Sequence, residues 1–188
     1  MSLFSLDNRV APMGLLVMDG ARELGREIDA YLVQWARQIG MDVDTFMIES
    51  ECPRFSSGDG KGLIKSTVRG MDLYIIVDVG NYSIKYKYFG QQNAMSPDDH
   101  FQDLKRLIQA ASGKAHRINI VMPLLYGGRQ HRRSYRESLD CAFMLQELQN
   151  MGVENVVTFD AHDPRVQNAV PLMGFDNLMP HYQVLKRM

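Results

Sequence analysis

The sequence has no apolar run that approaches the length of a transmembrane helix, and its N-terminus lacks a basic segment followed by an apolar one. We therefore expect neither a membrane anchor nor a secretion signal, and we expect a cytoplasmic protein without a membrane partner. Low-complexity blocks and internal repeats are also absent, while hydrophobic residues make up 45% of the chain. This composition argues against a disordered or fibrous protein.

Cysteine is scarce. The two cysteines, Cys52 and Cys141, form neither a pair with metal-ligand spacing nor a disulfide framework, which fits a reducing compartment. We expect both thiols to be structural. The sequence also offers no convincing covalent nucleophile or catalytic triad, and we assign no catalytic residue within this chain.

Neither sign of charge is in excess, because 21 Lys and Arg are balanced by 22 Asp and Glu. No global positive field therefore draws the chain to nucleic acid, and we expect no nucleic-acid partner. One stretch of the sequence nevertheless lacks acidic residues. The stretch YGGRQHRRSYR, residues 126–136, holds four arginines and one histidine without an acid. Any function of this cluster must be local.

Short apolar segments alternate with patterns of helical spacing over a length suited to one domain. This order predicts an α/β fold of three layers, with a mostly parallel sheet flanked by helices on both faces. We expect residues 1–12 to be a leader or flexible arm and residues 13–188 to be the folded domain. The stretch 80–96 leaves three interpretations open: a hairpin, a lid or an oligomer contact. The strands are expected at 13–19, 42–50, 62–67, 72–79, 117–126 and 153–162.

A helix is predicted to begin near residue 96. Ser96 can cap it, Pro97 suits its first position, and Asp98 and Asp99 favour the positive end of the helix dipole. The buried stripe of this helix is expected to be Phe101, Leu104, Leu107 and Ile108.

Two polar clusters follow predicted strands, and ligands of such sheets bind beyond the carboxyl ends of the strands. In DAHD, Asp160 and Asp163 flank His162, and Asp176 follows later. Oxygen ligands with one imidazole suit a magnesium ion that is held partly by substrate phosphates and water. The spacing alone is a weak signal for a metal, because Asp163 before Pro164 is also typical of a helix N-cap followed by its first residue, which is the favoured interpretation of Asp163.

The other cluster is GGRQHRR, residues 127–133. Its paired glycines allow a ligand to approach the backbone closely, and arginine matches phosphate oxygens with two hydrogen bonds at a time. Arg129 and Gln130 lie nearest the strand end and are the favoured ligand contacts. For Arg132, Arg133 and Arg136, pairing with surface carboxylates on a solvated loop is an equal alternative.

Three segments, taken together and in order, resemble signatures of the ribose-phosphate pyrophosphokinase family. They are RFSSGDGKGLIKSTVRGMDLYIIVD (54–78), RINIVMPLLYGGRQHRR (117–133) and VENVVTFDAHDPRVQ (153–167). The usual forms in the family are close to RFSDGE with ESVRG, PYARQDRK and DLHxxQIQ. The resemblance implies a phosphoribosyltransferase-like fold. It also implies Mg²⁺-assisted transfer of the ATP diphosphoryl group to ribose 5-phosphate, for nucleotide biosynthesis. Such chemistry depends mainly on positioning and charge neutralisation.

The resemblance also implies residue roles. The first segment would contact the adenine of ATP bound at a neighbouring subunit, which requires a homo-oligomer, a dimer or hexamer. The second would lie beside the ATP phosphates, and His162 would belong to the magnesium site, with Asp160 and Asp176 as weaker metal candidates. The nucleotide-binding candidates are Phe55, Ser57, Gly58, Asp59, Arg129, Gln130 and His131.

Three departures from the family forms stand out. Ser57 and Asp59 replace the acidic loop residues, His131 replaces the aspartate of RQD, and DLHAS becomes DAHDP. Family members continue into a second domain with the catalytic loop and the ribose 5-phosphate loop. We therefore expect this chain to be the N-terminal domain of a two-domain enzyme, inactive alone. A non-catalytic regulatory homologue is the alternative, and a phosphoribosyltransferase of the same fold class ranks third.

Overall fold

The computed structural model describes residues 11–188. Its centre is a six-stranded sheet in the order β10-β9-β8-β5-β1-β2, and every pairing within it is parallel. The predicted α/β fold with a parallel sheet is confirmed. The N-terminal leader that we expected over residues 1–12 lies almost entirely outside the described residues. The strands are β1 (Met13–Val17), β2 (Met47–Ile48), β5 (Asp72–Ile76), β8 (Arg117–Val121), β9 (Asn155–Phe159) and β10 (Gly174–Leu178).

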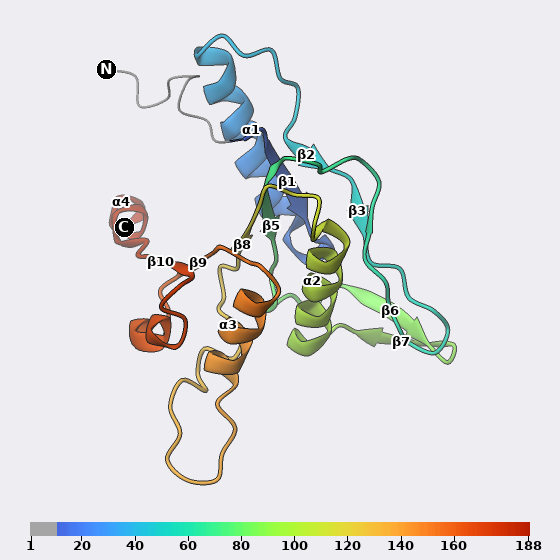
Figure 1. Cartoon of the computed structure of the whole chain (residues 1–188), viewed down its shortest axis with the longest axis vertical. Coiled ribbons are helices and arrows are strands. Elements are labelled where there is room, and N and C mark those ends of the chain that lie inside the picture. Colours follow the sequence, from blue (N-terminus) through green and yellow to red (C-terminus); the bar gives the residue numbers. More distant parts are fainter. Residues whose placement is uncertain (1–10) are drawn as a thin grey trace.

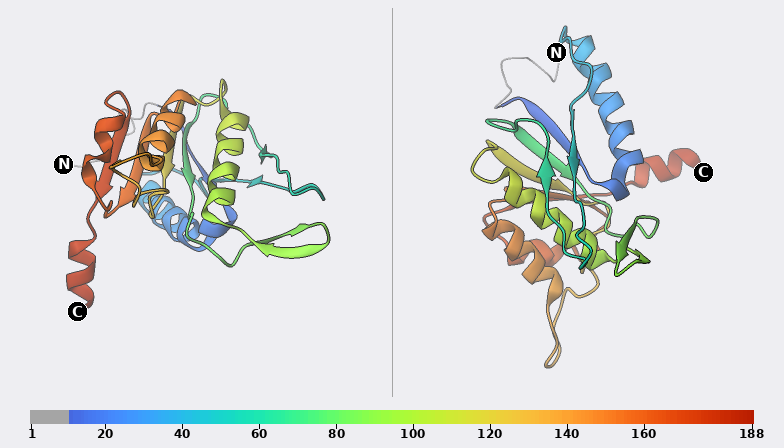
Figure 2. Two further views of the ribbon diagram at one scale, coloured as in Figure 1. Left: turned by 90° about the horizontal axis from the view of Figure 1, so that it is seen from below. Right: turned by 90° about the vertical axis from the view of Figure 1, so that its right-hand side faces the viewer.

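Helices cover both faces of this sheet (Figure 2). The 3-10 turn η2 (Asp19–Ala21) leads into α1 (Arg22–Gln38) on one face, and α2 (Pro97–Ala111) and α3 (Asp140–Asn150) cover the other. The 3-10 helix η3 (Pro164–Ala169) precedes β10, and α4 (His181–Arg187) projects away from the sheet. Within residues 11–188, no helix is both long enough and apolar enough to cross a bilayer.

Alternating strand residues build two cores. Leu15 and Val17 point toward α1, whereas Leu16 between them belongs to the larger core beneath α2 and α3. This alternation follows from the two-residue period of a strand. Leu73 and Ile75 of β5 are fully buried in the larger core.

The start of α2 is as predicted. The Ser96 hydroxyl accepts a hydrogen bond from the Asp99 N–H (3.1 Å), and the Asp99 carboxylate accepts one from the Ser96 N–H (2.9 Å). This reciprocal capping box satisfies two helix-end groups. The expected stripe is confirmed, because Phe101, Leu104, Leu107 and Ile108 are all buried.

An arm projects beside α2 (Figure 1). It consists of the loop 54–60, which lies between the short antiparallel strands β3 (Ser50–Glu51) and β4 (Leu63–Ile64), and the antiparallel hairpin of β6 (Lys85–Tyr88) and β7 (Gln91–Ala94). The predicted strand 42–50 is mostly loop, because only Met47–Ile48 pairs with β1. The hairpin interpretation of residues 80–96 is confirmed.

Candidate functional site

A cavity of about 450 Å³ opens at the carboxyl ends of β5, β8 and β9. Loops that follow these three strands form its wall, together with Pro97 at the start of α2. Four of the residues predicted from the sequence meet here: Arg129, Gln130, Asp160 and His162. Parallel strands bring their carboxyl ends to one edge of a sheet, which explains why loops distant in sequence converge.

The loop after β8 is fixed at its base. The Tyr126 ring stacks on Phe101 at 4.6 Å and 6°, and its hydroxyl donates a 2.7 Å hydrogen bond to Asp98. Burial, reinforced by this hydrogen bond, raises the pKa of Tyr126 to about 12. Gly127 has a φ of +65°, a conformation that glycine adopts without strain, and it turns the chain toward Arg129.

The residues that follow Gly127 in this loop differ in whether hydrogen bonds within the described chain hold them. The Gln130 backbone N–H donates to the Gly127 carbonyl (2.8 Å), and its side-chain amide donates to the Ser138 carbonyl (2.5 Å). Arg129 is exposed, and its guanidinium has no hydrogen-bond or ion-pair partner within residues 11–188. The same holds for the exposed Arg132, Arg133 and Arg136, so the described part of the chain supplies no carboxylate partner for them.

The turn after β9 is held by β10. Asp160 adopts a φ of +47°, and its N–H donates to the Leu178 carbonyl (3.0 Å). The N–H of Ala161 donates to the side-chain oxygen of Asn177 (2.9 Å). Left-handed backbone at a non-glycine residue is strained and must be maintained by its surroundings. The Asp160 and His162 side chains are exposed and line the cavity.

Asp163 is an N-cap residue, as one of the two interpretations predicts. Its carboxylate accepts from the Arg165 N–H (3.0 Å) at the start of η3, and Pro164 occupies the first helical position. The Arg165 side chain binds the same carboxylate, at 2.6 Å for Nη2, and holds the pKa of Asp163 well below its usual range.

The two loops also contact one another. Nδ1 of His131 lies 3.1 Å from a carboxylate oxygen of Asp163. The His131 ring meets the His162 ring edge to face, with centroids 5.2 Å apart and planes at 61°.

Asp176 lies elsewhere. It sits within β10 opposite Val157, and its carboxylate accepts a 2.6 Å hydrogen bond from the Asn155 side chain. It does not line the cavity. Among the residues that the structure describes, no group of three His, Cys, Asp or Glu side chains could hold a metal ion by itself. Asp160 and His162 fit a magnesium ion only if phosphate and water oxygens complete its shell, which is common for this ion.

The nucleotide-binding candidates of the first segment lie on the arm and not at the cavity (Figure 1). Phe55 is 57% exposed, so it is not a core aromatic. Its N–H donates to the Asp59 carbonyl (2.7 Å), and the Ser57 hydroxyl donates to the Asp59 carboxylate (2.8 Å). Gly58 has a φ of +92°, and a Cβ there would lie 2.7 Å from the Tyr88 ring. The loop is therefore a closed turn that the hairpin covers.

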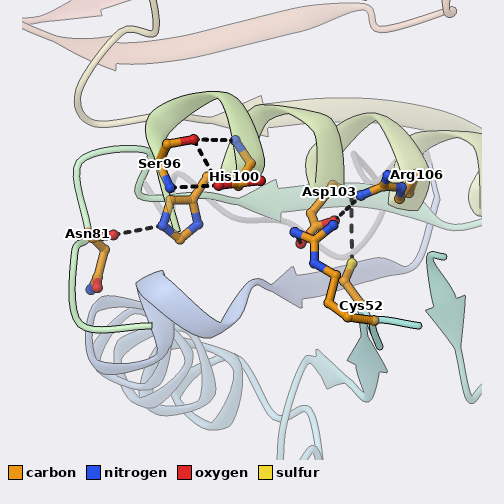
Figure 3. A network of polar contacts seen from close by, with 8 residues as sticks. Cys52, Asn81, Ser96, His100, Asp103 and Arg106 are labelled. Carbon is orange, nitrogen blue, oxygen red and sulfur yellow. Dashed lines mark hydrogen bonds and ion pairs between the residues drawn. The ribbon is translucent and has the colours of Figure 1, made fainter. Parts of the chain in front are cut away.

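A buried ionic group fastens this loop to α2. The Asp103 carboxylate lies 2.8 Å from Nη2 of Arg54 and 2.6 Å from Nη1 of Arg106. Figure 3 shows Asp103 and Arg106 close to Cys52, whose thiol donates to the Asp103 carbonyl at 3.8 Å. Burial raises the pKa of Asp103, and the guanidiniums oppose that rise. The Arg54 guanidinium also lies 4.9 Å from the Tyr86 ring centre in the hairpin.

Sequence reasoning missed the loop after β5 as a third wall of the cavity. Val79, Gly80 and Tyr82 line it there. The loop is held by α2, because Nε2 of the buried His100 lies 2.7 Å from the Asn81 carbonyl oxygen (Figure 3). The signal was present in the sequence, since the predicted strand 72–79 also ends at this edge of the sheet.

The parallel sheet, the helices on both faces and the cavity at one edge define an α/β protein of the class whose sites form from strand-end loops. The sequence profile described as the N-terminal domain of ribose phosphate pyrophosphokinase matches residues 13–152. The chain therefore belongs to the ribose-phosphate pyrophosphokinase family, which confirms the family that the resemblance indicated.

Individual relatives agree with this assignment. A putative ribose-phosphate pyrophosphokinase 2 of Listeria monocytogenes is 25% identical over 148 residues, which are 72% of this chain and 43% of that protein. The ribose-phosphate pyrophosphokinase of Corynebacterium ammoniagenes is 29% identical over 128 residues, or 67% of this chain and 36% of that protein. The chain thus spans less than half the length of these curated relatives.

A solved structure confirms the fold. The crystal structure of phosphoribosylpyrophosphate synthetase from Mycobacterium smegmatis matches with a TM-score of 0.72 and 16% sequence identity. The match covers 94% of this chain and 51% of that one.

Proposed function

We propose that this chain supplies the ATP-side half of the active site of a ribose-phosphate diphosphokinase. The observation that carries the proposal is the meeting of Arg129, Gln130, Asp160 and His162 around one cavity in a member of this family. In the reaction, the C1 hydroxyl oxygen of ribose 5-phosphate forms a bond to the β-phosphorus of ATP. The bond from that phosphorus to the oxygen bridging to the α-phosphate breaks, AMP leaves, and the hydroxyl loses its proton.

The residues that line the cavity have different proposed roles, which follow from their charge. The Arg129 guanidinium, which has no hydrogen-bond or ion-pair partner within residues 11–188, binds triphosphate oxygens, and Gln130 lies beside it. Mg²⁺, when bound, neutralises phosphate charge and orients the transferred group. Asp160 and His162 would contact this ion, with phosphate and water oxygens completing its shell. We leave Asp176 out of this set, because its carboxylate is engaged by Asn155 on the face of the sheet.

The arm serves a different copy of the chain in this proposal. Phe55 would stack on adenine, with Ser57, Gly58 and Asp59 around it, in a site completed by a neighbouring subunit. Support comes from the exposure of Phe55, from the anchoring of its loop by Asp103, and from its separation from the cavity of its own chain. The functional protein would then be a homo-oligomer, a dimer or hexamer, that works in the cytoplasm without a nucleic-acid or membrane partner.

Residues 13–188 act as an N-terminal domain in this account, and a second domain contributes the catalytic loop and the ribose 5-phosphate site. The coverage of the relatives supports that division, because this chain spans less than half of their length. No residue of this chain is assigned a catalytic role. We expect the 188-residue chain alone to bind MgATP but not to form AMP from ATP and ribose 5-phosphate.

Calorimetric titration of MgATP tests the proposal. Arg129→Ala should weaken binding about tenfold or more, because a charge-assisted pair with phosphate is lost. Arg136→Ala, which removes an equally exposed arginine of the same loop outside the cavity lining, is the matched control and should leave affinity unchanged. His162→Ala should remove the part of the affinity that depends on Mg²⁺. Absence of MgATP binding by the unaltered chain would overturn the proposal.

One observation favours a second candidate. His131 stands where the family form has an aspartate, a change that a non-catalytic regulatory homologue would tolerate. Such a protein need not bind ATP in a metal-dependent way. Titration of ATP with Mg²⁺ and then with EDTA distinguishes the two functions, because only the synthetase half requires higher affinity in the presence of the metal.

A further inference from the structure

The loop after β8 and the turn after β9 are joined by a side-chain ion pair at the edge of the cavity. His131 belongs to the first and Asp163 to the second, and Nδ1 of the ring lies 3.1 Å from the carboxylate. Both side chains are largely shielded, with exposed fractions of 14% and 11%. The pair is therefore a partly buried link between the loop of Arg129 and the turn of His162.

Asp163 is a rigid end of this link. Its carboxylate accepts the Arg165 backbone N–H at 3.0 Å and the Arg165 side chain at 2.9 Å for Nε and 2.6 Å for Nη2. Three donors of one neighbour fix the carboxylate, so a contact to it also fixes the position of the His131 ring. That ring in turn lies edge to face against His162.

We propose that His131 and Asp163 form a loop clamp, a pair of positioning residues that sets the spacing between the Arg129 loop and the His162 turn. The clamp depends on the proposed function only for the identity of its ligand, a nucleoside triphosphate with Mg²⁺. Without the clamp, the spacing between the two halves of the phosphate site is less firmly set. Neither residue is required to touch the nucleotide.

Hydrogen exchange in the unliganded chain tests the clamp without reference to any ligand. His131→Asn should accelerate exchange in the peptide that contains residues 160–163, and Asp163→Asn should accelerate it in the peptide that contains residues 127–131. The double variant should match the single variants, because one link is lost in each case. His116→Asn, at an exposed histidine remote from the cavity, is the control. Changes confined to the peptide that carries each substitution would overturn the clamp.

MgATP titration of the same variants gives the functional outcome. Each single variant should bind about tenfold more weakly, and the double variant should be no worse than either, since coupled residues are not additive. Independent, additive losses would overturn the clamp. If the unaltered chain binds no MgATP, the proposed function fails, and the exchange experiment still decides on the clamp.

Discussion

Arg54 and Asp103 lie 49 residues apart in sequence, yet their side chains meet at 2.8 Å in a buried ion pair. The pair joins the first residue of the loop 54–60 to the middle of α2. Because Phe55 follows directly, the position of the exposed aromatic ring depends on a contact inside the molecule.

Asp103→Asn should destabilise the chain by about 3 kcal/mol, since it leaves the buried guanidinium of Arg54 and the partly buried one of Arg106 without a counter-charge. Urea denaturation followed by circular dichroism measures the free energy of unfolding. Asp42→Asn, at an exposed carboxylate, serves as the control and should change it by less than about 0.5 kcal/mol. Equal stability of the two variants would contradict a stabilising role for the pair.

The hairpin should protect the loop 54–60. Tyr88 packs on Gly58, and the Phe89 N–H donates to the Ser56 carbonyl at 3.3 Å. Tyr88→Ala should therefore raise the rate of trypsin cleavage after Arg54 and Lys61 severalfold, because local opening becomes easier. Mass spectrometry of the fragments identifies the cut sites. Tyr135→Ala removes an aromatic that is 85% exposed and should leave these rates unchanged.

Both thiols should be inert in the folded chain. Burial raises the pKa of Cys52 to about 12 and that of Cys141 to about 11. Only the thiolate reacts, so at pH 8 roughly one molecule in a thousand carries a reactive Cys141. A thiol-specific chromogenic reagent should detect no fast-reacting group before denaturation and both cysteines in urea. Rapid reaction of the native chain would contradict structural roles for the thiols.

Acid should weaken the turn at Asp163. The Arg165 hydrogen bonds hold the pKa of Asp163 below its unfolded value of about 3.9, so folding favours the ionised form. The resulting stabilisation is fully present above the unfolded pKa and is lost as the pH falls through the folded pKa. Unfolding measured between pH 6 and pH 2 should show a smaller loss of stability for Asp163→Asn than for the unaltered chain. Parallel pH profiles would show that Asp163 is not responsible.

The sequence predicted those features that depend on neighbouring residues or on strand direction. Ser96 and Asp99 are three residues apart, so their capping box is visible as a local pattern. Arg129 and His162 could be predicted to lie at the same edge of the sheet, because each follows a strand of a parallel sheet.

Contacts between segments distant in sequence were not predictable in the same way. Nothing local to Arg54 identifies Asp103 as its partner, and nothing local to His131 identifies Asp163. Helical spacing also leaves the depth of burial open. Tyr31 and Trp35 lie at helical spacing within α1 but are 61% and 48% exposed, whereas the smaller Val33 and Ala36 of the same helix are buried.

The separation of Phe55 from Arg129 within one chain has a genetic consequence under the proposed arrangement. A copy that lacks Phe55 still has an intact cavity, and a copy that lacks Arg129 still has an intact arm. When the two copies associate, the intact arm of one copy and the intact cavity of the other form one complete nucleotide site. Two inactive alleles of such a gene should therefore complement each other when they are expressed together, although neither supports function alone.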